Sequence, residues 1–129
     1  MLRAARRPGC LAALLALFAS VGCDAPNARR QRLQSLSPVE RSDAIVASAQ
    51  SRDYAAVAAL VERLDDDDRA VRLYAILALR ELCGEDFGYR YYAPSAERAS
   101  AIEAWRAALR EGRFGSPGET PVREANKGP

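Results

Sequence analysis

The sequence predicts an all-α fold of about two antiparallel helical hairpins, and two observations lead to that prediction. Between residues 37 and 111, apolar side chains recur at helical spacing in four separate segments. Residue types that favour helix starts and helix ends lie at the boundaries of these segments. We therefore assign residues 37–111 to one small helical domain.

The first two predicted helices are defined by their N-terminal residues. Ser37–Glu40 has the composition of a capping box with proline at the first helical position, and the helix that it begins extends to about Gln50. Ser51 or Asp53 supplies the cap of the second helix, over residues 54–64. The apolar residues of the first helix are Val39, Ile45, Val46 and Ala49. Those of the second are Tyr54, Val57, Ala58, Val61 and Leu64.

The third and fourth helices carry the strongest apolar patterns. The third begins near Arg69 and ends at Gly84, a residue type that is favoured just past a helix C-terminus. Apolar residues occupy most of its circumference, which predicts a central position in the domain. Those residues are Val71, Leu73, Ala75, Ile76, Leu77, Ala78, Leu79 and Leu82. The fourth helix opens at Ser95, and its apolar face is Ile102, Trp105 and Leu109.

The second and third helices, joined by the acidic turn Asp65–Asp68, resemble a HEAT repeat. The residues that match the repeat pattern in order are Asp68, Val71, Arg72, Ala75, Ala78 and Leu79. The resemblance implies a short HEAT-like α-solenoid in which Arg72 ties the start of its helix to the adjacent turn. Asp68 is placed to cap that helix, and Ala75 and Ala78 permit close helix approach. Two hairpins are too short for a long concave binding groove.

Residues 1–22 have the features of a secretory signal peptide. Arginines precede the apolar run Leu11–Ala19, and the apolar stretch is too short to cross a bilayer as a helix. The pair Gly22-Cys23 resembles the lipobox of bacterial lipoproteins, in which the cysteine is lipidated, although Ser20 stands where such signals usually carry leucine. The resemblance implies a membrane-anchored lipoprotein of the cell envelope that faces the periplasm or the exterior, and plain secretion is the alternative.

The composition of the remaining chain predicts two segments that flank the domain. Residues 23–36 are polar, Arg-rich and without apolar periodicity, which is typical of a tether between lipid and domain. Their arginines either contact anionic lipid or are simply solvated. Residues 112–129 hold four of the eight glycines and three of the seven prolines, a composition that predicts disorder.

Charge and residue usage disfavour several functions. The first 22 residues hold three arginines and no acid, so the rest of the chain has 16 basic residues against 17 acidic ones. That balance does not predict a nucleic-acid partner. The chain has no histidine, the commonest general base and metal ligand, and we predict no catalytic residue, no cofactor and no metal site. Asp65–Asp68 lacks the spacing of a calcium loop. Cys83 is predicted to be a small buried apolar residue.

The segment Tyr89, Arg90, Tyr91 and Tyr92 is the candidate binding surface, because tyrosine and arginine are enriched at protein interfaces. The alternative is that these rings pack onto the helices and cover one end of the stack. The function predicted on this basis is protein–protein interaction with an unidentified partner. An accessory or lyase-like enzyme subunit is the second possibility, and it would need a pocket beside Glu85 or Asp86.

Overall fold

The computed structural model describes residues 25–114, and within that range it contains helices and no strand, so the all-α prediction is confirmed. Five α-helices and two 3₁₀ turns make up the described chain. In order they are α1 (Pro26–Arg32), α2 (Pro38–Gln50), η1 (Tyr54–Ala56), α3 (Val57–Glu62), η2 (Arg63–Asp65), α4 (Arg69–Cys83) and α5 (Ser95–Arg110).

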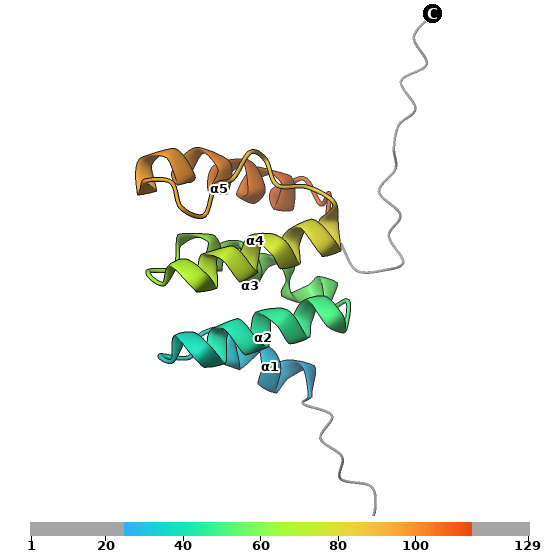
Figure 1. Cartoon of the computed structure of the whole chain (residues 1–129). Helices are drawn as coiled ribbons and strands as arrows, with labels where there is room; N and C mark the ends of the chain where they lie inside the picture. The colour runs from blue at the N-terminus through green and yellow to red at the C-terminus, as the bar shows by residue number, and fades with distance from the viewer. Residues whose placement is uncertain (1–24, 115–129) are drawn as a thin grey trace, which may run out of the picture.

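The helices form a stack in which α2 and α4 lie side by side at the front, with α1 and α3 behind them (Figure 1). Helix α4 packs against both α2 and α3, whereas α1 packs against α2. Helix α5 packs against α3 and η2 at the other end of the stack. Arg98 of α5 pairs with Asp65, and Arg106 pairs with Glu62. Helix α5 therefore runs antiparallel to α3 and η2.

Local capping explains where the two front helices begin and end. The Ser37 hydroxyl accepts a hydrogen bond from the Glu40 N–H at 3.4 Å, at the start of α2. The Asp68 carboxylate accepts from two backbone N–H groups in the first turn of α4, at 2.8 and 3.1 Å. Gly84 ends α4 with a φ of 72°, a conformation that glycine adopts without the Cβ clash of other residues. The predicted bounds of both helices are confirmed.

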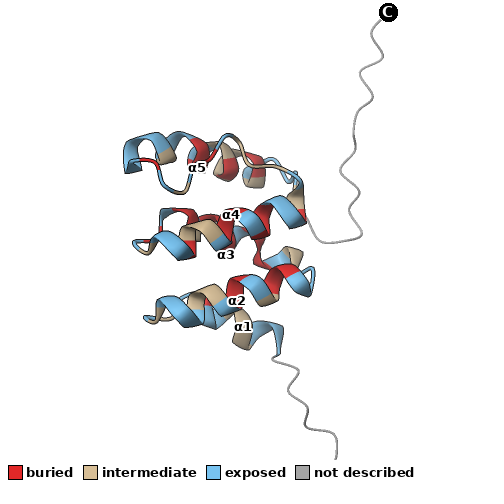
Figure 2. Cartoon of the chain, viewed as in Figure 1, coloured by how far each residue is buried: buried red, intermediate tan, exposed pale blue. Residues whose placement is uncertain are grey.

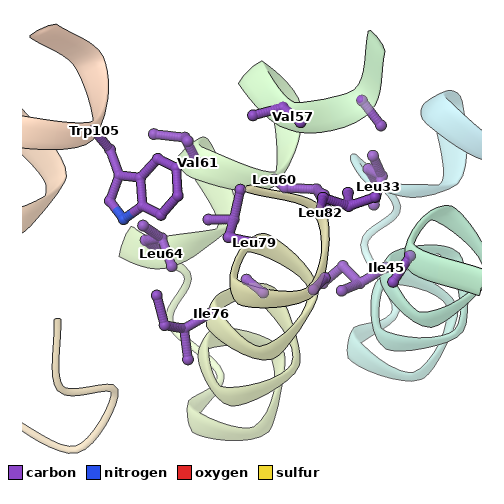
Figure 3. Close-up of a cluster of buried hydrophobic side chains, with 14 of the residues drawn as sticks. Leu33, Ile45, Val57, Leu60, Val61, Leu64, Ile76, Leu79, Leu82 and Trp105 are labelled. Atoms are coloured by element: carbon purple, nitrogen blue, oxygen red, sulfur yellow. The ribbon is translucent and has the colours of Figure 1, made fainter. Parts of the chain in front are cut away.

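Helix α3 and η2 lie at the centre of the hydrophobic core, and Figure 2 shows many buried residues, drawn in red, in this part of the chain. Leu60, Val61 and Leu64 are fully buried there. Leu33 extends the core toward α1 and α2, and Trp105 extends it toward α5 (Figure 3). One continuous apolar core therefore joins every helix layer of the stack.

The segment before residue 37 differs from the predicted tether. Residues 26–32 form α1, and the Leu33 side chain that follows is fully buried. Arg30 of α1 makes an ion pair with Asp53 at 2.9 Å. Polar composition hid this helix, because α1 itself buries no residue and is held by contacts with neighbours far along the chain. The domain boundary at residue 37 was wrong, and the folded unit includes α1.

Leu33 and Leu36 provide a test of this boundary. We expect Leu33→Ala to lower the free energy of unfolding by about 2–4 kcal/mol, because the side chain is fully buried in the core. Leu36→Ala is the matched control, since Leu36 is 98 % exposed, and it should change stability by less than about 0.5 kcal/mol. Urea denaturation followed by circular dichroism measures both. Equal effects of the two substitutions on stability would contradict the inclusion of α1 and Leu33 in the folded unit and would favour the predicted linker.

The pair α1–α2 and the pair α3–α4 are built to the same plan, 31 residues apart along the chain. Leu33 follows α1 and Leu64 follows α3, and both are fully buried. Helices α2 and α4 begin at equivalent positions, one after the N-cap Ser37 and the other after the N-cap Asp68. The two pairs therefore enter their front helices through turns of the same length.

Two hydrogen bonds in each turn join residues at equivalent positions. Arg41 Nη1 donates to the Ser35 carbonyl oxygen at 2.6 Å, and Arg72 Nη1 donates to the Asp66 carbonyl oxygen at 2.6 Å. The side chains of Ser35 and Asp66 each accept from the backbone N–H two residues later, at 3.1 and 3.0 Å. Within residues 25–114, two helical pairs with equivalent turns are therefore followed by α5.

Candidate functional site

The structure removes Tyr89 from the predicted binding surface. Its ring is buried in the core, and its hydroxyl donates to the carbonyl oxygen of Leu64 in η2. Arg90, which comes next, is exposed and pairs with Glu97 at 2.7 Å. The prediction that Tyr89 contacts a partner was wrong, because a long-range hydrogen-bond acceptor holds the ring inside the molecule.

Tyr91 and Tyr92 lie at the surface with different exposures. Tyr91 is half-buried, with its ring edge-to-face with that of Tyr92 at 5.2 Å between ring centroids and beneath the Arg69 guanidinium. The Tyr91 carbonyl oxygen accepts from Arg72 Nε at 3.0 Å, which fixes the segment to the start of α4. Tyr92 is 57 % exposed. The loop between α4 and α5 therefore mainly covers the end of the stack.

Tyr89 gives a stability prediction with a pH dependence. Tyr89→Phe should lower the free energy of unfolding by about 1–1.5 kcal/mol, because it removes a buried hydrogen bond. Burial raises the pKa of Tyr89, so the neutral phenol is favoured in the folded state. The stability from this group is complete below the unfolded pKa of about 10 and is lost as the pH rises through the folded pKa.

Denaturation curves at pH 8, 10 and 11 measure this effect for both proteins. Burial also raises the pKa of Cys83 to about 11, so its thiol contributes an alkaline loss of stability that both proteins share. The parent should therefore lose more stability than Tyr89→Phe between the first and last pH. Parallel losses would contradict a buried, neutral Tyr89.

Asp86 is the acid that an enzyme-like site would need, and its surroundings stabilise the charged form. The carboxylate accepts from the Gly88 N–H at 2.8 Å and from Arg80 Nη2 at 2.8 Å. The Gly88 hydrogen bond, followed by the Arg80 hydrogen bond, lowers the pKa of Asp86. A general acid at neutral pH needs a raised pKa. The arrangement therefore favours a structural role for Asp86, which holds the loop through Gly88 and Arg80, over proton donation. Neighbouring Glu85 pairs with Arg113.

The acidic turn between α3 and α4 uses its carboxylates to hold the fold. Asp66 has a side chain only 4 % exposed and pairs with Arg41 at 3.0 Å and Arg63 at 3.3 Å. Asp65 pairs with Arg98, and Asp68 caps α4. No cluster of His, Cys, Asp or Glu suited to a metal occurs within residues 25–114. Sequence reasoning treated the aspartates as one turn and missed the buried role of Asp66.

The residues that carry the HEAT resemblance hold the start of α4 and its buried face in the stack. Arg72 donates to the carbonyl oxygens of Asp66 and Asp67 at 2.6 and 2.9 Å, so it ties α4 to the acidic turn. The four apolar residues of the pattern are all buried: Val71, Ala75, Ala78 and Leu79. These side chains position α4 within the stack.

The two cysteines with predicted roles differ in whether the structure describes them. Cys83, at the end of α4, is half-buried, and its raised pKa of about 11 leaves very little reactive thiolate at neutral pH. Cys23, the predicted lipidation site, lies outside the described residues, as do residues 1–22 and 115–129. Within residues 25–114, no helix has the length and apolar character needed to cross a bilayer.

The main surface feature that the sequence analysis missed lies between the front helices. Val39 and Val46 of α2 and Tyr74 and Leu77 of α4 are large apolar residues with exposures of 36 to 68 %. They line a groove along the two helices, here named the α2/α4 groove. The sequence analysis counted Leu77 among the apolar residues around a central helix, whereas Leu77 and the neighbouring Tyr74 face solvent.

Three adjoining depressions make up the α2/α4 groove, with volumes of about 320, 200 and 190 Å³. The largest lies between the starts of the two helices, beside Val39 and Ala70. The smallest lies toward their ends, between Ala49 and Glu81. Tyr74 lines all three depressions, so it occupies the middle of the groove.

A further depression of about 470 Å³ lies beside α5. Its charged lining residues are Asp65, Glu103 and Arg106. Asp65 pairs with Arg98, and Glu103 and Arg106 pair with each other at 3.8 Å. The charges at this surface are therefore already neutralised by neighbours within the fold.

The chain was compared with protein-family models, with curated proteins and with solved structures, and none of the three comparisons found a match.

Proposed function

We propose that this chain is a lipid-anchored protein of the cell envelope whose short HEAT-like module mediates protein–protein interaction. The observation that carries the proposal is the α2/α4 groove, where Val46, Tyr74 and Leu77 remain exposed although neighbouring side chains on the same helices are buried. Contiguous exposed apolar side chains that polar residues surround are typical of interaction sites.

The 31-residue duplication supports the HEAT-like part of the proposal. In stacked helical repeats, each pair buries its apolar face against the next pair, and the terminal units carry polar outer faces. Helix α1 is polar and buries no residue, which suits one terminal position. Helix α5 and the loop that carries Tyr89 cover the core at the other end. The exposed apolar residues then lie along the stack, on α2 and α4.

Co-purification tests the interaction. The tagged chain, extracted from membranes in mild detergent, should carry a specific protein in near-stoichiometric amount, quantified against an untagged strain. Recovery of the chain alone at native expression levels would contradict an interaction function.

Cys23→Ser tests the anchor. Because stable membrane attachment by lipid needs more than one acyl chain or signal, loss of the modified cysteine should move most of the chain from the membrane fraction to the soluble fraction. Cys10→Ser and Cys83→Ser are the matched controls, because neither residue is the proposed acylation site, and both should leave partitioning unchanged. Membrane partitioning of Cys23→Ser equal to that of the parent would rule out lipidation at this position.

A further inference from the structure

The α2/α4 groove is bordered by two stripes with the same helical spacing. Val39, Asp43, Val46 and Gln50 follow one another on α2 at i, i+4, i+7 and i+11. Ala70, Tyr74, Leu77 and Glu81 follow the same spacing on α4. Residues with this spacing share one face of a helix.

The two helices are parallel, which keeps their stripes in register along the whole groove. Val39 and Ala70 line the same depression near the helix starts. Val46, Leu77 and Glu81 line the same depression near the helix ends. Apolar side chains therefore occupy both walls from one end of the groove to the other.

The groove is acidic as well as apolar. Asp43, Asp68 and Glu81 line its three depressions, and no arginine or lysine is among the described lining residues. Asp68 is engaged in capping α4, whereas the carboxylates of Asp43 and Glu81 have no ion-pair partner within residues 25–114.

Carboxylates on other surfaces of the described chain are mostly paired with arginine. Asp53 pairs with Arg30, and Asp86 pairs with Arg80. The residue equivalent to Asp43 in the second helical pair is Tyr74, and the one equivalent to Gln50 is Glu81. Each wall of the groove therefore carries one carboxylate without an arginine partner, beside exposed apolar side chains.

From this combination we infer that the α2/α4 groove binds an amphipathic helix of a partner protein whose apolar face is flanked by lysine or arginine. The inference rests on the proposed interaction function and adds the surface and the chemistry of the partner. A helix laid between two parallel helices matches their apolar spacing. Helix α2 is 13 residues long, or about 20 Å, so it accommodates a partner helix of similar length.

Charge argues for a protein segment rather than a membrane as the occupant. Asp43 and Glu81 repel the anionic headgroups of a bilayer surface and attract basic side chains. Lysine or arginine residues on the partner helix would pair with both carboxylates. The apolar face of that helix would then lie against Tyr74 at the centre of the groove.

The test uses synthetic helical peptides of about 14 residues with the full chain. One peptide carries leucines at i, i+4, i+7 and i+11 with flanking lysines, and the other carries glutamates in place of the lysines. Fluorescence anisotropy should show binding of the lysine peptide, and at least tenfold weaker binding of the glutamate peptide. Equal binding of the two, or binding of neither, would overturn the inferred chemistry.

Variants of the chain locate the site. The double substitution Asp43→Lys and Glu81→Lys should weaken binding of the lysine peptide at least tenfold. Tyr74→Ala should weaken it to a similar extent. The matched controls are Glu111→Lys, an exposed acid outside the groove, and Tyr92→Ala, an exposed tyrosine in the loop before α5. Both controls should bind as the parent does. Circular dichroism establishes that each variant retains the parent helicity, and folded groove variants that bind normally would overturn the inference.

Other occupants give distinct results in the same preparation. Sedimentation that shows self-association abolished by Tyr74→Ala would assign the groove to a second copy of the chain. Groove-dependent binding to anionic phospholipid vesicles would assign it to a bilayer. Either result overturns the inferred partner and leaves the proposed interaction function to the co-purification experiment.

Discussion

Trp105→Ala should unfold most of the domain at physiological temperature. The Trp105 side chain is fully buried and joins α5 to the core beside Val61 and Leu64 (Figure 3). Its ring also packs edge-to-face against that of Phe87, at 4.9 Å between centroids, and in a tilted arrangement against that of Phe114, at 5.3 Å. Truncation of such a residue costs about 3–5 kcal/mol, which is comparable to the whole stability of a small helical core.

Thermal denaturation followed by far-UV circular dichroism measures the effect, since Trp105 is the only tryptophan and its fluorescence is lost. At about 4–8 °C per kcal/mol for a domain of this size, the midpoint should fall by roughly 15–30 °C. Tyr92→Ala is the matched control, because Tyr92 is an exposed aromatic residue, and it should shift the midpoint by only a few degrees. A loss below about 1 kcal/mol for Trp105→Ala would contradict the position of α5.

Asp66→Ala should give the second large loss of stability, about 2–4 kcal/mol. The substitution removes the partner of Arg41, whose side chain is also largely buried, and the acceptor for the backbone N–H of Asp68. A buried charge without its partner is costly, although Arg63 is exposed enough to regain water. Because Arg41 belongs to α2 and Asp66 to the turn before α4, the loss would weaken the contact between the two helical pairs.

Urea denaturation of Asp66→Ala, Arg41→Ala and the double variant gives a double-mutant cycle. We expect a coupling free energy of about 1–3 kcal/mol between the two residues. Asp67→Ala is the matched control, because Asp67 is the exposed neighbour and its side chain makes no ion pair within residues 25–114. Additive effects of Asp66→Ala and Arg41→Ala would contradict the ion pair as a link between the pairs.

The helices with local start and stop signals were predictable from the sequence. Ser37, Asp68 and Gly84 act on backbone groups within a few residues, so their effect on α2 and α4 is readable without knowledge of the fold. Trp105 was also assigned correctly to the core, because it lies on the apolar face of a strongly periodic helix.

The features that sequence reasoning missed depend on contacts far along the chain. Helix α1 has no apolar stripe, and its burial partner Leu33 is a single residue beyond its end. A comparison of the chain with itself at a shift of 31 residues would have found it, because Arg32-Leu33 aligns with Arg63-Leu64 and Arg41 aligns with Arg72. An internal repeat is a stronger signal than local composition for a short polar helix.

In the candidate site, too, local patterns were predictable and features that depend on distant contacts were not. Whether an apolar residue on α4 is buried depends on which neighbour covers it, and none of the helices between residues 25 and 114 covers Tyr74 and Leu77. The opposite holds for Tyr89, an aromatic residue in a loop that is buried because the Leu64 carbonyl oxygen lies within reach of its hydroxyl. Periodicity gave the apolar faces of each helix, and the packing of the stack decided which of them remained exposed.

Site-specific photo-crosslinking in living cells tests the proposed interaction most directly. A photoreactive phenylalanine analogue replaces Tyr74 in the α2/α4 groove or, in a separate strain, the exposed Tyr92 in the loop before α5. We predict a discrete crosslinked protein adduct from position 74 and none from position 92. An adduct from position 92 alone would keep the interaction function and move its surface to the loop. The absence of any protein adduct at both positions would contradict an interaction role for these two surfaces of the module.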